Sequence, residues 1–416
     1  ANNVAVGANS LRANTTGASN TAVGYLALCK TTTGGQNVAT GACALFANTT
    51  GANNAAFGFC ASAAGTTANL NTAIGNFALK VSEAGCKNTA VGYQSMFDAT
   101  TSECNTALGA YSLTNNTTAN FNTAIGTCSM YTNTTGHSNV AVGYNSLDAN
   151  TTGDYNVAIG FCSLTTATTA DGNTALGNSA LKLTTTGADN VAVGRRSLCT
   201  NTTGGNNTSV GPYSMTSNTT GAGNVAVGIQ TLCSNTTASN NTAVGLNSLM
   251  TNTTGASNTG VGRCTLALTT TGLANTAMGT MGMCANTTGA CNVAIGSNSL
   301  RTNQTSHYNT AVGYNALRLN TAASNTAVGH SSLACNTSGA DNTAVGADAL
   351  KANTTGYINV AIGHDAMIAN TEGQGNVAIG GLALDANTTG GTNVAIGCDS
   401  LSTNTTCSAN VAIGHC

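Results

Sequence analysis

The sequence has no tryptophan, a single proline, and charged side chains at only 6% of its 416 residues. An ordinary globular domain has about 25% charged residues, so this composition argues against a chain of two or three such domains. The formal net charge is -2 at pH 7, which provides no electrostatic attraction for nucleic acid or for an anionic membrane. No apolar run is long enough to span a bilayer, so we expect no membrane insertion.

Asparagine, threonine, alanine and glycine dominate instead, and they follow a fixed order. The phrase Asn-x-x-x-Gly occurs in 25 copies, from Asn3–Gly7 to Asn410–Gly414, and it recurs every 17 residues except for one 16-residue interval between Gly313 and Gly329. A disordered chain would not keep this phase, whereas a stacked-repeat protein requires it. We number the repeat from its asparagine, so that the glycine is position 5, and we count the coils from 1 to 25.

The composition of each position predicts the fold. Position 2 is mostly Val or Thr, and position 8 is small. Position 3 is Ala except at Ser209 and Gly260, position 4 is apolar except at Thr40, and position 9 is Leu or Met except at Ser62. Seventeen residues are too few for two helices but suffice for two short strands and two turns, and Val/Thr-Ala-Val alternates as a strand does. We therefore predict an all-β, parallel β-solenoid of about 25 coils, as one continuous array over residues 1–416 that belongs to a longer fibre.

Stacking assigns a role to the repeated side chains. Asparagines at position 1 are expected to form a hydrogen-bonded ladder from coil to coil. We expect positions 4 and 9 to fill the core, so that Val193→Asp would place a charge there and Asn190→Ala would unpair the ladder. Glycine at positions 5 and 15 would provide positive φ or close backbone approach at the corners. The ladder includes Asn3, Asn20, Asn37, Asn54, Asn190 and Asn410.

Two details of the repeat need an explanation. Position 3 stays small although it points away from positions 2 and 4, so either a neighbouring chain or a tight contact within the coil must approach it closely. We favour the neighbouring chain. The residue missing between Gly313 and Gly329 is expected to fall in the turn at residues 319–323, with the stack continuing on both sides.

The phrases NVAVG, NTAIG and NVAIG, each followed by a small residue, a leucine and a glycine turn, resemble the head repeats of trimeric autotransporter adhesins. Similar arrays occur in phage tail fibres and related surface proteins. The resemblance covers essentially the whole chain and implies a left-handed parallel β-roll, three of which pack side by side into a trimer. It also implies binding of host matrix or receptors, although repeats of this kind are scaffolds that serve many functions.

Asn-Thr-Thr at positions 12 to 14 creates acceptor motifs for N-glycosylation. Glycosylation requires these asparagines to lie on an exposed turn, whereas turn formation alone would also favour the same residues. Both interpretations remain open at this point. The motifs begin at Asn14, Asn48, Asn116, Asn133, Asn150, Asn201, Asn218, Asn235, Asn252, Asn286, Asn303, Asn336, Asn353, Asn387 and Asn404.

The 16 cysteines show no zinc-type spacing, and the five histidines lie singly, so we expect no metal site, no cofactor and solvated histidines. Adjacent coils would bring some thiols within disulfide reach, which favours an oxidising compartment; reduced surface thiols are the alternative. The expected pairs are Cys43 with Cys60, Cys86 with Cys104, and Cys398 with Cys416. No arrangement of nucleophile, base and acid can be argued, so we expect no catalytic residue and no enzyme.

These observations predict a non-enzymatic extracellular structural fibre or adhesin shaft on a cell or virion surface. We expect self-association, as a lateral trimer or as an end-to-end filament in which Cys398, Cys407 and Cys416 could link copies. Glycans or a cell-surface receptor are further candidate partners. The alternative function is ice binding through ladders of threonine at positions 13 and 14 and, in part, at position 2.

Overall fold

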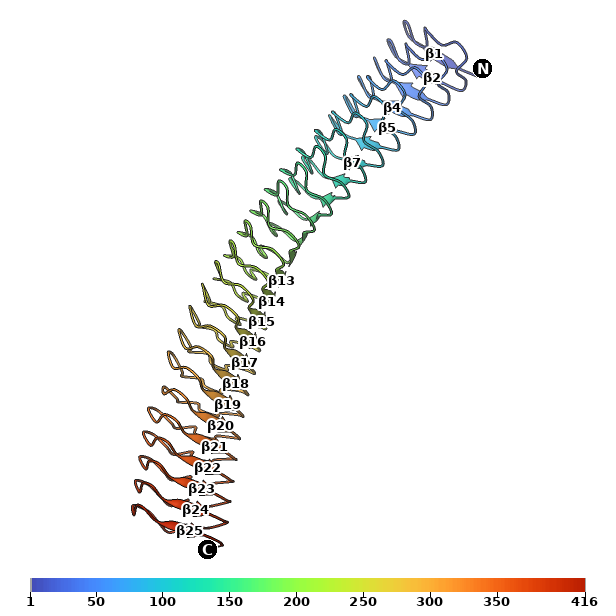
Figure 1. The fold of residues 1–416 in the computed structure, drawn as a ribbon. Coiled ribbons are helices and arrows are strands. Elements are labelled where there is room, and N and C mark those ends of the chain that lie inside the picture. The colour runs from blue at the N-terminus through green and yellow to red at the C-terminus, as the bar shows by residue number, and fades with distance from the viewer. Residues whose placement is uncertain (1, 416) are drawn as a thin grey trace. The chain divides into compact units, whose positions relative to one another are not determined.

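The computed structural model describes residues 2–415, and it confirms a parallel β-solenoid with a 17-residue repeat. Each coil contains one three-residue strand at positions 2 to 4, followed by turns (Figure 1). The prediction of a second strand in each coil is wrong, because residues 2–415 contain only one strand per coil. No helix occurs among residues 2–415, and so none that could cross a membrane.

The chain divides into two compact units, Ala1–Asn207 and Thr208–Cys416. Within each unit, every strand pairs in parallel with the strands of the adjacent coils, as in the register of Val4 with Thr21. The strands of the first unit are β1 (Val4–Val6), β2 (Thr21–Val23), β3 (Val38–Thr40), β4 (Ala55–Phe57), β5 (Thr72–Ile74), β6 (Thr89–Val91), β7 (Thr106–Leu108), β8 (Thr123–Ile125), β9 (Val140–Val142), β10 (Val157–Ile159), β11 (Thr174–Leu176) and β12 (Val191–Val193). Those of the second are β13 (Thr208–Val210), β14 (Val225–Val227), β15 (Thr242–Val244), β16 (Thr259–Val261), β17 (Thr276–Met278), β18 (Val293–Ile295), β19 (Thr310–Val312), β20 (Thr326–Val328), β21 (Thr343–Val345), β22 (Val360–Ile362), β23 (Val377–Ile379), β24 (Val394–Ile396) and β25 (Val411–Ile413).

Backbone hydrogen bonds between coils continue around the turns. At position 9, the Leu28 amide donates to the Ala44 carbonyl at 3.0 Å. At position 13, the Thr15 amide donates to the Thr32 carbonyl at 3.0 Å. The turns therefore satisfy much of their backbone polarity through the neighbouring coils, although they do not form a second sheet.

The core lies on the opposite side of the strand from the one we expected. The position-3 side chain of Ala22 and the position-9 side chain of Leu28 are fully buried, whereas Val23 at position 4 is 36% exposed. Position 4 therefore points outward, and its assignment to the core is wrong. Val193 is half-buried on this outward face, so an aspartate there would not place a charge in the core.

Position 3 is small because of a contact within the solenoid. A Cβ added to Gly260, at position 3 of its coil, would lie 2.6 Å from Ser248 Oγ and 3.1 Å from Thr265 Oγ1, which both occupy position 8. The inward side of the strand thus packs directly against position 8 of its own coil and of the coil before. The neighbouring-chain explanation for position 3 is wrong.

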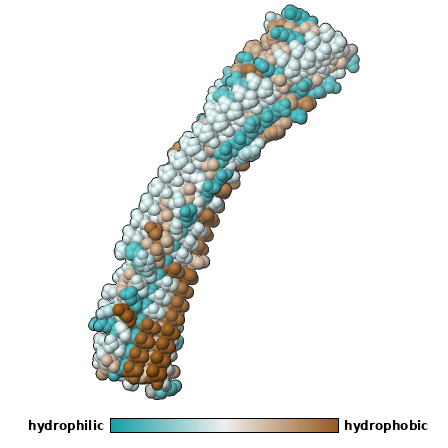
Figure 2. Space-filling model, in the orientation of Figure 1, coloured by the Kyte–Doolittle hydropathy of each residue, from teal (hydrophilic) through white to brown (hydrophobic). Residues whose placement is uncertain are grey.

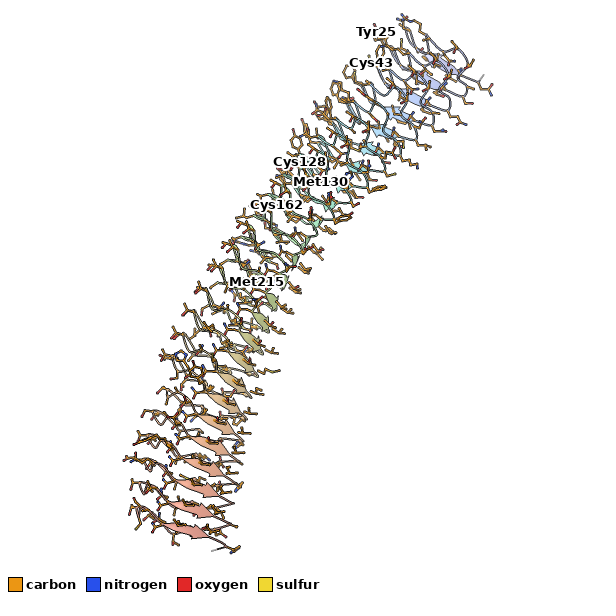
Figure 3. All side chains as sticks on the ribbon, in the orientation of Figure 1. Tyr25, Cys43, Cys128, Met130, Cys162 and Met215 are labelled. Carbon is orange, nitrogen blue, oxygen red and sulfur yellow. The ribbon has the colours of Figure 1, made fainter. Side chains whose placement is uncertain are left out.

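Position 9 adopts left-handed backbone geometry, with φ of 49° at Leu28 and 50° at Met130. A β-branched side chain is strongly disfavoured at such φ values. This explains why an apolar core position is filled by leucine and methionine but never by valine or isoleucine. Figure 3 labels two of the methionines, Met130 and Met215, and both are fully buried.

The asparagine ladder at position 1 is confirmed and is fully buried away from the outermost coils. Asn37 Nδ2 donates to Asn20 Oδ1 at 3.1 Å and to the Gly51 carbonyl at 2.9 Å. The Asn37 amide also donates to Asn20 Oδ1, at 3.0 Å. Each asparagine therefore joins the side chain and backbone of its neighbours, and also closes its own coil onto position 15.

The short coil behaves as expected. Strands β19 and β20 keep their register, with Thr310 opposite Thr326. Asn309 Nδ2 donates to the Ala322 carbonyl at 2.9 Å, which is 13 residues ahead rather than the usual 14. The missing residue is thus absorbed by the turn, and both the strand register and the ladder continue.

The two glycine positions serve the two purposes that we expected. Gly143 at position 5 has a φ of 136°, a conformation that side chains disfavour. At position 15 the cause is close approach, since a Cβ on Gly136 would lie 2.4 Å from the Gly153 carbonyl oxygen. Both corners therefore need a residue without a side chain, or at position 15 a very small one.

Candidate functional surfaces

The outer face of the sheet, formed by positions 2 and 4, is the most extensive candidate surface. It carries no charged residue in any coil, and position 4 is apolar in every coil except at Thr40. Figure 2 shows part of this face in the second unit as brown columns that run from coil to coil, across successive strands, toward β25. The position-4 side chains that are at least 36% exposed are Val6, Val23, Phe57, Ile74, Leu108, Ile159, Leu176, Val227, Met278, Ile295, Val328, Val345, Ile362, Ile379 and Ile413.

Threonine columns exist, but they differ in availability. At position 13, Thr134 Oγ1 donates to the Thr151 carbonyl at 2.9 Å, so these hydroxyls help to join the coils. Position 2 lies on the outer face, and β5 to β8 provide four consecutive threonines there, from Thr72 to Thr123. In the strands that have threonine at position 2, the outer face therefore presents one hydroxyl beside the apolar side chain of position 4.

The proposed glycosylation positions do not lie on an exposed turn. Asn133 is fully buried, and its Nδ2 donates to Asn116 Oδ1 at 3.2 Å and to the Gly136 carbonyl at 3.0 Å. Position 12 thus forms a second asparagine ladder inside the coil. The premise of exposure is wrong for all the acceptor asparagines except Asn14 and Asn404, which are half-buried. A glycan on a buried Nδ2 would disrupt the corner, so we do not propose glycosylation there.

This second ladder is interrupted where the next coil lacks asparagine at position 12. Asn150 is followed by Ala167 and Asn252 by Thr269, and the Oδ1 atoms of both asparagines are buried without a hydrogen-bond partner. An unsatisfied buried acceptor costs about 1–3 kcal/mol. The position-12 ladder is therefore a set of short segments, whereas the position-1 ladder has asparagine in every coil.

Two of the predicted disulfide pairs are neighbouring thiols rather than disulfides. Burial raises the pKa of the Cys60 thiol, and the adjacent Cys43 raises it further. Burial also raises the pKa of Cys86, as does a hydrogen bond to Glu103. A raised pKa lowers the thiolate fraction at neutral pH and so slows oxidation. The third predicted pair involves Cys416, which lies outside the described residues.

Aromatic side chains gather at positions 6, 7 and 10 in the first unit. The rings of Phe59 and Phe77 pack edge to face with centroids 5.2 Å apart, and those of Tyr93 and Tyr111 do so at 5.4 Å. Lys80 Nζ lies 5.3 Å from the centroid of the Phe77 ring. These rings share much of their surface with one another, so this row serves first to pack adjacent coils together. Figure 3 labels Tyr25 at position 6 and Cys43 at position 7, near the N-terminal end of the first unit.

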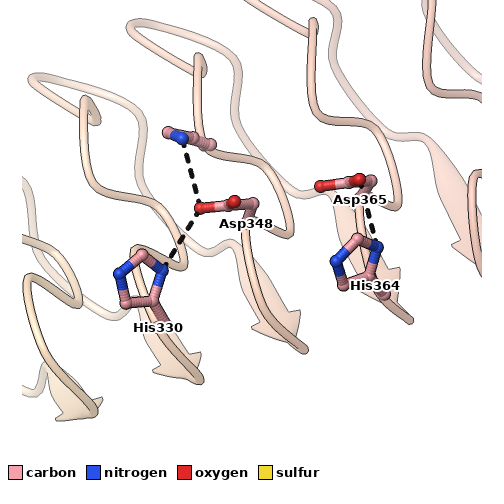
Figure 4. Close-up of polar contacts among 5 residues, drawn as sticks. His330, Asp348, His364 and Asp365 are labelled. Carbon is pink, nitrogen blue, oxygen red and sulfur yellow. Dashed lines mark ion pairs between the residues drawn. The ribbon is translucent and has the colours of Figure 1, made fainter.

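Positions 6 and 7 of the second unit carry a row of histidines and aspartates (Figure 4). His330 Nδ1 lies 3.6 Å from Asp348 Oδ1, and His364 Nδ1 lies 3.1 Å from Asp365 Oδ2. Lys351 Nζ lies 3.3 Å from Asp348 Oδ1. The expectation that these histidines are solvated is confirmed, since their side chains are 59% and 69% exposed, but they do not lie singly because each contacts an aspartate.

Two other histidines, His137 and His307, contact the backbone of a neighbouring coil. His137 Nδ1 accepts a hydrogen bond from the Asn120 amide, and His307 Nδ1 accepts one from the Ala290 amide, both at 2.9 Å. In each case the partner belongs to the preceding coil. These two side chains are thus part of the coil-to-coil bonding.

A different grouping occurs where coils 24 and 25 meet. Cys398 and Asp399 occupy positions 6 and 7 of coil 24, and His415 occupies position 6 of coil 25. Their sulfur, oxygen and nitrogen atoms all lie within 4.8 Å of one another. A search for closely spaced ligands misses this group because 17 residues separate two of its members. Aligning the sequence on the repeat would have placed them together.

No protein-family model matches the chain, and no curated protein matches it either. The similarity to adhesin head repeats therefore stays a prediction.

Proposed function

We propose that this chain is a non-enzymatic, extracellular structural fibre or adhesin shaft that associates side by side with further copies of itself through the outer face. The observation that carries the proposal is the uncharged, largely apolar column of position-4 side chains. Contiguous exposed apolar surface of more than a few hundred Å² is rare on monomeric soluble proteins and marks interaction sites.

The repeat of the chain favours a second copy as the occupant of this face. A partner must match one apolar side chain per coil, spaced by about 4.8 Å, over many coils. Another solenoid with the same repeat meets this requirement automatically. A globular receptor would cover only a few coils, although a receptor or glycan could still bind elsewhere on the assembled fibre. The trimer implied by the adhesin resemblance is one arrangement that would bury the face.

An extracellular location is supported by the composition. Charged side chains make up only 6% of the chain, so the polarity of its surface comes mainly from amide and hydroxyl groups. A repetitive scaffold of this kind fits a fibre on a cell or virion surface. We propose no catalytic residue.

The test compares two triple variants in the second unit. Val345→Asp, Ile362→Asp and Ile379→Asp place three charges on the outer face at position 4 of coils 21, 22 and 23. The control, Ser338→Asp, Thr355→Asp and Thr389→Asp, places the same charges at exposed position 14, where the natural chain already has Glu372. Each protein is measured by sedimentation velocity over a range of concentrations.

We expect the unmodified chain and the control to form oligomers, and the outer-face variant to remain monomeric at the same concentrations. Circular dichroism should be alike for all three, because position 4 points away from the core. A monomeric unmodified chain at all concentrations would overturn the proposal. Unchanged association of the outer-face variant would do so as well.

Ice binding is a second candidate, favoured by the consecutive outward threonines of β5 to β8. A flat, regularly spaced array of hydroxyl and methyl groups is the kind of surface that can order water in an ice-like lattice. Thermal hysteresis of the isolated chain, lost on Thr89→Lys and Thr106→Lys, would support this function. Absence of both hysteresis and inhibition of ice recrystallisation would exclude it.

A further inference from the structure

We propose that Cys398, Asp399 and His415 form a binding site for a divalent transition-metal ion of the zinc type, which links coils 24 and 25. The site is independent of the outer face, because positions 6 and 7 lie beyond the position-5 corner of the coil. It therefore does not depend on the proposed fibre function.

The three side chains already lie close enough together to hold one ion. The three ligand atoms already lie within 4.8 Å of one another, and Cys398 Sγ lies 3.6 Å from Asp399 Oδ2. Metal–ligand bonds of about 2.0–2.3 Å in a tetrahedral site require ligand atoms about 3.3–3.8 Å apart. Side-chain rotations that move the atoms by about 1 Å are therefore sufficient.

Hydrogen bonds to neighbouring coils hold in place the backbone that carries these ligands. The Asp399 amide donates to the Gly381 carbonyl at 3.0 Å, and the Gly414 amide donates to the Ile396 carbonyl at 2.8 Å. Strands β24 and β25 pair in register immediately before the two corners. The ligands therefore project from adjacent, hydrogen-bonded coils, which reduces the conformational freedom lost on binding.

The donor set selects the class of metal. A thiolate, an imidazole and a carboxylate suit Zn²⁺ and chemically similar ions such as Co²⁺. Ca²⁺ and Mg²⁺ prefer sets made entirely of oxygen. On binding, the Cys398 thiol releases its proton to solvent, the imidazole binds in its neutral form, and water completes the fourth position.

The rest of the row provides a comparison. His330 with Asp348, and His364 with Asp365, pair the same imidazole and carboxylate groups at positions 6 and 7, and no cysteine occupies position 6 or 7 of those coils. They form ion pairs of the ordinary kind when the histidine is protonated. Coils 24 and 25 differ by adding a sulfur ligand, which makes the set specific for a soft or borderline ion.

The test is a Co²⁺ titration of the full chain under reducing conditions, followed by the thiolate-to-cobalt charge-transfer absorption. The variants are Cys398→Ser, Asp399→Asn and His415→Gln, and the matched controls are Cys407→Ser and His364→Gln. Cys407 is an exposed cysteine of the same coil, and His364 is an exposed histidine of the same row. Circular dichroism verifies that each variant remains folded.

We expect one Co²⁺ to be displaced by Zn²⁺, the charge-transfer band to be lost in Cys398→Ser, and the apparent Kd to rise at least tenfold in His415→Gln. Asp399→Asn should weaken binding less, because an amide oxygen can still coordinate. The two controls should bind like the unmodified chain.

Zn²⁺ should also slow hydrogen exchange in residues 397–415 of the unmodified chain and not in Cys398→Ser. A titration that is unaffected by both Cys398→Ser and His415→Gln would overturn the proposal. So would equal loss of the band in Cys407→Ser, since binding would then not be specific to this site.

Discussion

At the scale of single residues, the asparagine at position 1 combines functions that no other side chain can. Its amide is short enough to stay inside the corner, and it offers both donors and acceptors. Asn190 shows the full set. Its Nδ2 donates to Asn173 Oδ1 at 3.1 Å and to the Gly204 carbonyl at 2.9 Å, and its Oδ1 accepts from the Asn207 amide at 3.0 Å. Aspartate would lack the donors, and serine could not span the same groups.

Asn190→Ala should therefore destabilise its surroundings by about 2–4 kcal/mol, because it leaves several buried polar groups without partners. In a solenoid, stability depends mainly on each coil and its nearest neighbours, so the loss should be local. Hydrogen exchange should accelerate in coils 11 and 12, residues 173–206. Thr203→Ala, at the exposed position 14 of the same coil, is the control and should have almost no effect. Uniform acceleration throughout residues 1–207 would contradict the prediction.

At the scale of the structural element, each coil is one short strand followed by corners that side chains can hardly enter. Two adjacent glycines, Gly380 at position 5 and Gly381 at position 6, show which position excludes a side chain. Gly380, at position 5, has a φ of 136°, and a Cβ there would lie 2.4 Å from the Gly397 carbonyl oxygen. Gly381 lacks this φ, and its nearest neighbour is the His364 carbonyl oxygen at 3.9 Å. One position requires glycine, while the next accommodates a methyl group.

Gly380→Ala should accordingly destabilise coils 23 and 24 by more than ~1 kcal/mol, because it adds both backbone strain and a clash with backbone. Gly381→Ala should be neutral or stabilise them by ~0.4–1 kcal/mol, because alanine restricts the unfolded chain. Local hydrogen exchange in residues 376–409 measures both effects. Equal destabilisation by the two variants would contradict the assignment of strain to position 5.

At the scale of the whole molecule, the repeat itself is the unit of construction. Each coil contributes a three-residue strand and the same position-1 asparagine, and nearly every coil adds leucine or methionine at position 9, so successive coils make closely similar contacts with their neighbours. Coil 19 shows that the corner accepts a change of one residue while the register is kept. Changes in the number of coils should be tolerated for the same reason, whereas changes in phase should not.

Deletion of residues 342–358 removes one complete repeat and brings Asn359 into the place of Asn342. The shortened chain should retain its circular dichroism per residue and unfold within a few degrees of the parent, because every ladder and strand pair is restored. Deletion of residues 342–350 is the control, since it removes about half a repeat and puts the coils out of phase. That variant should lose order in the coils around the deletion. Similar behaviour of the two deletions would contradict a stacking mechanism.

The sequence alone was sufficient for the period, the strand and the ladder. Asparagine at position 1 in every coil, from Asn3 to Asn410, indicates a side chain that pairs with its own copies, and the structure confirms this. The corner glycines and the short turn before Asn325 followed equally directly. These features depend on hydrogen bonding and φ preferences between neighbouring coils, so a repeated residue type is enough to reveal them.

Only the tertiary structure decided which side of the strand faces inward. Ala22 and Val23 alternate in the same way whichever one is buried, and a larger apolar residue is ordinarily the better candidate for a core. The coil is so narrow that alanine fits inside and valine does not, because position 8 and the leucine at position 9 already fill the space. The same narrowness buries the asparagines of position 12 and places the apolar column of position 4 on the outside. It also brings Cys398 beside His415, an adjacency that arises from stacking and not from spacing along the chain.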